Sequence, residues 1–102
     1  KNIALEAAHI KWFEAKGPDS ENNGLALCTL HHKLFDFGAY TISDKRIILV
    51  SDLVNGNGAN EWLIKFHGKS IKLPQRKNHY PEPEYVEWHV KEVFKGMERE
   101  QY

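Results

Sequence analysis

The first third of the chain contains three informative stretches: Ala8-His9-Ile10, Asn23-Gly24-Leu25-Ala26-Leu27-Cys28, and Leu30-His31-His32-Lys33-Leu34-Phe35-Asp36. A loop at 17–24, rich in Gly, Pro and Asn, separates the apolar segment 3–10 from the second stretch. We therefore expect a strand over 3–10, a loop, and a second strand over 25–28. The third stretch predicts a helix with Thr29 as N-cap, running to about Phe35 and stopping at Gly38.

The rest of the chain predicts a hairpin and a final helix. Two β-prone segments, 40–43 and 46–51, flank Asp44-Lys45, a turn signal that lacks the favoured glycine. A short helix is expected at 59–66 and irregular structure at 72–83, where prolines recur. Apolar residues then return at helical spacing, which predicts a C-terminal helix over about 84–99. The expected fold class is α+β, in a single domain spanning 1–102.

Composition limits the function classes. The 102 residues carry 14 Lys and Arg against 14 Asp and Glu, so the formal charge is zero and a DNA-coating protein is disfavoured. The longest apolar run, Ile47-Ile48-Leu49-Val50, is far too short to span a membrane, and the start does not resemble a signal peptide. We expect a soluble, cytoplasmic protein. Lys1 in place of a methionine predicts a piece of a longer chain.

Cysteine and charge patterning narrow the chemistry further. Cys28 is the only cysteine, which excludes an internal disulfide and a four-cysteine zinc site, so a metal must rely on His, Asp, Glu or Asn. Between Glu61 and Glu82 the chain contains basic residues and no acid. This basic tract consists of Lys65, Lys69, Lys72, Arg76 and Lys77. It is a candidate phosphate-contacting surface, and the alternative is a solvated loop.

The three stretches together resemble the HNH, or ββα-metal, endonuclease superfamily. The resemblance covers the region 3–38 and implies a ββα-metal core, to which the hairpin at 40–51 and the C-terminal helix are added. The hairpin and the tail 85–96 resemble the C-terminal nuclease domains of bacterial modification-dependent restriction endonucleases, whose relatives act on phosphorothioated or methylated DNA. This implies double-stranded DNA as the partner, a bacterial cytoplasmic location, and a homodimer where both strands are cut.

The resemblance also assigns roles to three residues. Phosphodiester hydrolysis needs a base for water, charge stabilisation at the phosphorus, and help for the leaving oxygen. By resemblance, His9 is the general base and Asn23 holds the loop and orients His9 through its carboxamide. His32 on the helix would bind one divalent metal ion.

The chain departs from the family pattern at Ala8, where an acidic metal ligand commonly precedes the first histidine. Asp36 lies four residues after His32 and would share its helix face, which makes it the first replacement. Glu6 lies on the same side of the strand as position 8 and is the second. The third option is a lightly held ion completed by water and substrate, which suits Mg²⁺. A nitrogen ligand also admits Mn²⁺, with Ni²⁺ or Zn²⁺ as further candidates.

Other residues have simpler interpretations. Three histidines, His67, His79 and His89, lack a partner at a chemical spacing and are expected to be structural or solvent-facing. The tryptophans and Cys28 are expected in or near the core. The leading hypothesis is a metal-dependent DNA endonuclease domain of a restriction enzyme. The alternative is a catalytically silent DNA-binding or zinc-stabilised interaction module that lost its acidic ligand at Ala8. A secreted nuclease toxin fits less well, because such chains are usually strongly basic.

Overall fold

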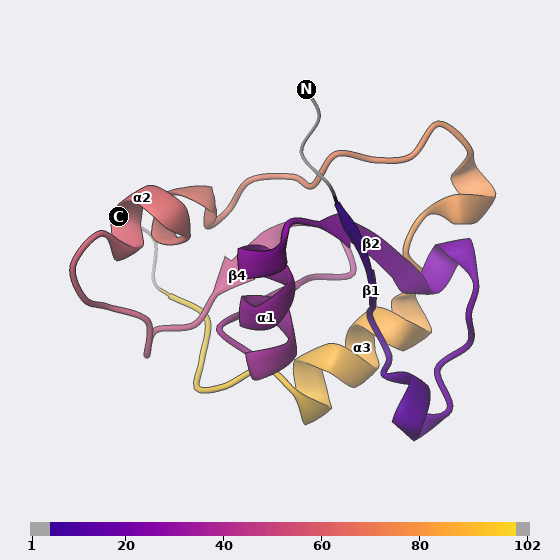
Figure 1. The fold of residues 1–102 in the computed structure, drawn as a ribbon, viewed down its shortest axis with the longest axis horizontal. Coiled ribbons are helices and arrows are strands. Elements are labelled where there is room, and N and C mark those ends of the chain that lie inside the picture. Colours follow the sequence, from indigo (N-terminus) through magenta and orange to yellow (C-terminus); the bar gives the residue numbers. More distant parts are fainter. Residues whose placement is uncertain (1–4, 100–102) are drawn as a thin grey trace.

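The computed structural model describes residues 5–99, which form two separate two-stranded antiparallel sheets and three α-helices (Figure 1). The first sheet pairs β1 (Glu6–His9) with β2 (Gly24–Leu27), and α1 (Thr29–Phe37) follows directly. The second sheet pairs β3 (Tyr40–Ile42) with β4 (Ile48–Val50), and the remaining helices are α2 (Ala59–Trp62) and α3 (Pro83–Glu92). The predicted α+β class is confirmed. Residues 3 and 4 of the expected first strand lie outside the described residues.

The strand, strand, helix order of the first third agrees with the prediction, with one change at the start of α1. The N-cap is Cys28 and not Thr29. The Thr29 hydroxyl instead donates to a Glu6 carboxylate oxygen at 2.9 Å, which ties the first turn of the helix to β1. At the other end Gly38 is the C-cap with φ +82°, as expected from its lack of a Cβ.

The hairpin forms where it was predicted, with shorter strands. Tyr40 pairs with Val50 and Ile42 with Ile48. Arg46 supplies the left-handed turn conformation that a glycine would have given, with φ 63°, and its N–H donates to the Ser43 carbonyl. The expected helix at 59–66 forms as α2 and a 3₁₀ turn, Ile64–Phe66, separated by a break at position 63. The segment 72–83 is irregular except for one 3₁₀ turn, Lys77–His79, and the start of α3 at its end.

The C-terminal helix is shorter than predicted: α3 ends at Glu92 and not near 99. Val93 is buried, and the chain then turns through Gly96, whose φ is +67°. Beyond the turn the backbone pairs with the end of β4, where the Asp52 N–H donates to the Met97 carbonyl at 2.8 Å. These long-range hydrogen bonds replace the last helical turns.

The core joins both sheets to α1 and α3. Its buried members are Ile10, Phe35, Tyr40, Ile42, Val50, Leu63 and Val86. His89 on α3 is fully buried, stacks on the Phe35 ring at 3.7 Å and contacts the Thr41 hydroxyl at 2.7 Å, so it is structural. The tryptophans are half-buried, and Trp12 packs edge-on against Trp88. Within residues 5–99 none of the helices has the length and apolar character that a membrane crossing requires.

Candidate active site

His9 ends β1 and faces a loop residue that the sequence did not single out. Its Nε2 lies 2.6 Å from Asp19 Oδ1. Because a carboxylate only accepts hydrogen bonds, Nε2 donates a hydrogen bond to Asp19, and in the neutral ring Nδ1 is left as the acceptor. Asp19 lies in the turn Gly17-Pro18-Asp19-Ser20, and aspartate is common in such turns. No local signal therefore distinguished Asp19 as a functional residue.

Asn23 anchors the loop by hydrogen bonds from its side chain to backbone atoms of the loop. Its side chain is buried, with 1% exposed. The Lys11 N–H donates to Oδ1 at 2.8 Å, and Nδ2 donates to the carbonyls of Lys11 and Pro18 at 3.0 and 2.9 Å. The Asn23 carboxamide therefore holds the loop, as expected, but all three of these hydrogen bonds are to backbone atoms and none is to the His9 ring. One of them fixes Pro18, the residue that precedes Asp19.

His32 lies between two carboxylates. Its Nδ1 is 2.7 Å from Glu6 Oε1, and its Nε2 is 3.3 Å from Asp36 Oδ2. The two ring nitrogens point to opposite edges of the imidazole, so Glu6 and Asp36 cannot both join His32 on one ion. The hydrogen bond from His32, with a second from Thr29, lowers the pKa of Glu6. Glu6 is therefore an anionic acceptor that fixes the His32 ring.

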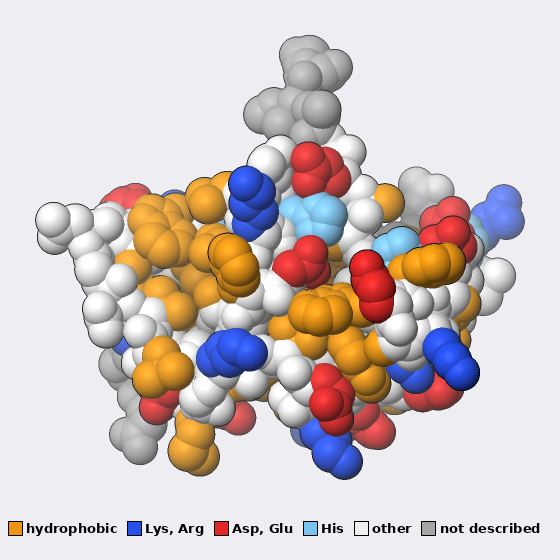
Figure 2. Space-filling view, turned by 60° about the horizontal axis from the view of Figure 1, so that its bottom comes forward, with side chains coloured by type: hydrophobic (Ala, Val, Ile, Leu, Met, Phe, Trp, Pro, Cys, Tyr) orange, Lys and Arg blue, Asp and Glu red, His pale blue; other side chains and the backbone are white. Residues whose placement is uncertain are grey.

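An open depression of about 820 Å³ collects the site residues. It is lined by His9, Trp12, Phe13, Glu14, His32, Asp36 and Phe37. Burial raises the pKa of Asp36, an effect that neighbouring His32 opposes. Glu6 and Asn23 do not line the depression; they support residues that do. Figure 2 shows a face on which histidine side chains lie among acidic and exposed apolar ones.

The donor set admits a lightly held metal ion. Within residues 5–99 no cluster of three or more His, Cys, Asp or Glu side chains is arranged as a metal site. His32 Nε2 and Asp36 Oδ2 nevertheless converge beside the depression, which offers one nitrogen and one oxygen. Two protein donors fit an ion that keeps several waters and takes further oxygens from a substrate, as Mg²⁺ does.

No member of the basic tract lines this depression. Lys65 is 3.9 Å from Glu61 and lies over the Phe66 ring. The other four members are exposed. The tract therefore offers exposed positive charge that does not line the depression with His9 and His32.

Cys28 is half-buried rather than fully in the core. Its Sγ lies 3.1 Å from His31 Nδ1, and hydrogen bonds from the His31 backbone and ring lower the pKa of the thiol. His31 Nε2, on the other side of the ring, donates a hydrogen bond to the Trp62 carbonyl at 2.7 Å. These contacts join the start of α1 to the end of α2.

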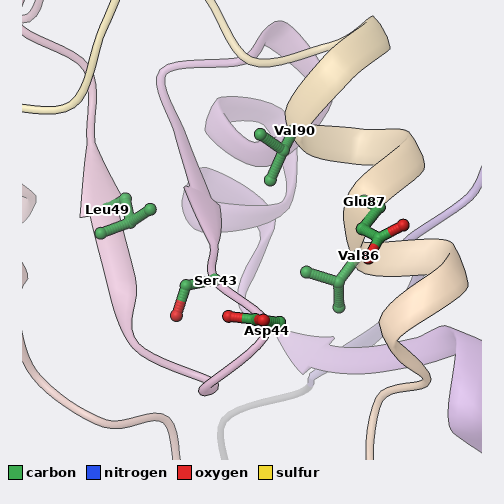
Figure 3. Close-up of a pocket in the computed structure, with 6 residues that line it drawn as sticks. All are labelled: Ser43, Asp44, Leu49, Val86, Glu87 and Val90. Atoms are coloured by element: carbon green, nitrogen blue, oxygen red, sulfur yellow. The ribbon is translucent and has the colours of Figure 1, made fainter.

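A second hollow, of about 270 Å³, lies between the β3–β4 turn and α3 (Figure 3). It is lined by Ser43, Asp44, Leu49, Val86, Glu87 and Val90. Among the residues that the structure describes, this lining contains neither histidine nor cysteine. The depression beside His9 and His32 is therefore the stronger candidate for chemistry.

Similarity to known proteins concerns the first 43 residues and the overall fold. Residues 1–43 match a family described as HNH endonuclease. Among solved structures, the fold is similar to "Modification dependent TagI restriction endonuclease", with a TM-score of 0.64 and 24% sequence identity over 91% of this chain. The chain spans 28% of the length of that protein. No curated protein gives a significant match. The chain thus resembles HNH-type nucleases in its first 43 residues and a restriction endonuclease in its fold.

Proposed function

We propose that this chain is a metal-dependent DNA endonuclease domain with a ββα-metal core formed by β1, β2 and α1. The observation that carries the proposal is the depression lined by His9, His32 and Asp36. A base and a pair of metal-binding side chains are the groups that phosphodiester hydrolysis requires. The match of residues 1–43 to HNH endonucleases supports the same conclusion.

In this proposal His9 is the general base. With Nε2 bonded to Asp19, the Nδ1 lone pair takes a proton from the attacking water. The carboxylate of Asp19 fixes the ring and stabilises the imidazolium that forms. Asn23 is a positioning residue, because it holds the Lys11 and Pro18 backbone on which His9 and Asp19 depend.

His32 and Asp36 would hold one divalent ion, Mg²⁺ or Mn²⁺, with Ni²⁺ or Zn²⁺ as further candidates. When bound, such an ion supplies charge stabilisation at a non-bridging phosphate oxygen and at the departing 3′ oxygen. Glu6 acts through His32: by accepting from Nδ1 it directs Nε2 toward Asp36. This arrangement replaces the acidic ligand that Ala8 lacks.

The substrate in the proposal is double-stranded DNA, and the domain is the cleavage module of a modification-dependent restriction enzyme of the bacterial cytoplasm. The similarity in fold to the modification-dependent TagI enzyme motivates the modification dependence. Phosphorothioated and methylated DNA are the two targets to compare. Cutting both strands would use two copies of the domain. The basic tract at 65–77 would contact phosphates outside the depression.

A second candidate is the catalytically silent, zinc-stabilised or DNA-binding module. Ala8 and the small donor set within residues 5–99 favour it. It predicts that Zn²⁺ raises the melting temperature while no metal supports cleavage.

The test is nicking of modified and unmodified supercoiled plasmid with Mg²⁺, Mn²⁺, Ni²⁺, Zn²⁺ or EDTA. The wild-type chain should nick in at least one metal and not in EDTA, and His32→Ala should lose metal-dependent nicking. His79→Ala is the matched control, because His79 lies outside the depression. Nicking by His32→Ala at the wild-type rate, or a folded wild-type protein inert in every metal, would contradict the proposal.

A further inference from the structure

Two phenylalanine side chains in the candidate active site have no evident role in the chemistry. Phe13 is 66% exposed and Phe37 is 72% exposed. Both line the same depression as His9, His32 and Asp36. Scattered apolar residues on a surface are ordinary, but two exposed aromatic rings that line one candidate active site are a local concentration.

Phe13 is displayed from a rigid loop. Asn23 bonds the backbone at both ends of residues 11–18. Within the loop the Gly17 N–H donates to the Trp12 carbonyl at 2.9 Å, and a Cβ on Gly17 would lie only 1.8 Å from the Lys11 carbonyl oxygen. The ring centroids of Phe13 and His9 are 6.2 Å apart. The loop therefore holds an exposed ring close to the proposed base.

Phe37 is held at a similarly ordered corner. It is the last residue of α1, and Gly38 follows as the C-cap. The Lys95 N–H donates to the Gly38 carbonyl at 3.0 Å, which ties this corner to the chain after α3. Because both backbones are already ordered, a ligand that contacts the two rings incurs little additional ordering cost.

The charge of the depression restricts what these rings can bind. Among the described residues, its lining contains Glu14 and Asp36 but no lysine or arginine. Apart from the two histidines and the proposed metal ion, this lining therefore offers a phosphate no cationic group, and the rest of its contact surface is mainly aromatic. The part of DNA that matches an aromatic surface is the face of a nucleobase.

We propose that Phe13 and Phe37 form a nucleobase-binding subsite beside the reacting phosphate, where their rings stack on bases next to the cleaved bond. This inference rests on the proposed nuclease function. In single-stranded nucleic acid, stacking of a base on an aromatic side chain contributes roughly 5- to 150-fold in affinity and tolerates any base. In a duplex the base next to the cleaved bond must also leave the helical stack, which offsets part of this gain. The subsite would position DNA without reading its sequence.

The test uses the whole chain and a short DNA duplex in which 5-iododeoxyuridine replaces thymidine. Irradiation followed by mass spectrometry identifies the crosslinked residues, and fluorescence anisotropy gives the dissociation constant. Phe13→Leu and Phe37→Leu keep apolar side chains but remove the aromatic faces. Met97→Leu is the control, because Met97 is 72% exposed and lies outside the depression.

We expect crosslinks at Phe13 and Phe37, a roughly fivefold or greater loss of affinity in each leucine variant, and no loss in Met97→Leu. Unchanged affinity in both leucine variants, crosslinks confined to other residues, or no DNA binding at all would overturn the subsite. Conversion of a dimer to a monomer by either substitution would also overturn it, since a second copy would then cover the rings.

The same measurements separate this inference from the nuclease proposal. Crosslinks at the two phenylalanines without plasmid cleavage in any metal would leave the subsite standing and remove the nuclease. Cleavage with unchanged DNA affinity in both leucine variants would do the reverse.

Discussion

The stability of the loop that carries Asp19 should depend on Asn23, and the loss of stability on substitution can be worked out from the hydrogen bonds that Asn23 makes. Asn23→Ala removes three hydrogen bonds to Lys11 and Pro18, and the site is buried. At about 0.5–1.5 kcal/mol for each bond, the free energy of unfolding should fall by about 1.5–4.5 kcal/mol. For a domain of this size that corresponds to a melting temperature lower by roughly 6 °C or more.

The substitution Asn23→Asp tests the two hydrogen bonds that Nδ2 donates. It places a carboxylate oxygen where Nδ2 donates to two carbonyls, so repulsion replaces two hydrogen bonds. We expect Asn23→Asp to be at least as destabilising as Asn23→Ala. Asn22→Ala is the matched control, because the described contact of its side chain is an exposed one with the Ser20 hydroxyl, and it should change stability by less than about 0.5 kcal/mol.

Urea unfolding followed by circular dichroism measures these differences, and plasmid nicking at a temperature where each variant is folded measures activity. Nicking should fall in Asn23→Ala, since the loop that holds Asp19 loosens. A loss of less than about 0.5 kcal/mol in Asn23→Ala would refute this dependence. So would an Asn23→Asp variant more stable than Asn23→Ala.

Three further predictions concern pH, metal binding and packing. Burial lowers the pKa of His89 from 6.5 to about 4, so between these two pH values the unfolded chain binds more protons than the folded chain. The free energy of unfolding should therefore fall by about 3 kcal/mol as the pH drops from 7 to 4. Urea unfolding measures this pH dependence, which should largely vanish in His89→Gln. Glu6→Gln should raise the metal concentration for half-maximal nicking by roughly 10- to 100-fold, because His32 loses its anionic acceptor, and an unchanged concentration would count against this role. Gly38→Ala should lower the free energy of unfolding by at least about 1 kcal/mol more than Gly56→Ala does. Both glycines have positive φ, but of the two only Gly38 would place a Cβ 2.1 Å from a carbonyl oxygen. Equal losses of stability in urea unfolding would contradict the packing argument.

The parts of the fold that were predictable depend on local signals. The turn formers before β2 and the stop at Gly38 lie next to the elements that they bound, so the strand, strand, helix order followed from the sequence. The end of α3 did not, because it is determined by the burial of Val93 and by pairing of residues 97–99 with residues 50–52. Contacts between segments so far apart in the chain leave no periodic pattern.

The candidate site, like the fold, was predictable from the sequence only in part. His9, His32 and Asp36 were identified from spacing and resemblance, and the structure brings them to one depression. Asp19 was missed because a turn aspartate is common. The role of Glu6 could not be separated from that of Asp36 until the two edges of the His32 ring were assigned.

The proposed chemistry depends above all on His9, and single-turnover nicking of supercoiled plasmid isolates its role. Wild type and His9→Ala are compared at saturating metal, with matched circular dichroism spectra. We predict that His9→Ala binds the plasmid as wild type does and nicks it about 100-fold more slowly or worse, because general base catalysis is lost. Nicking by His9→Ala at the wild-type rate would contradict the assignment of His9 as the base.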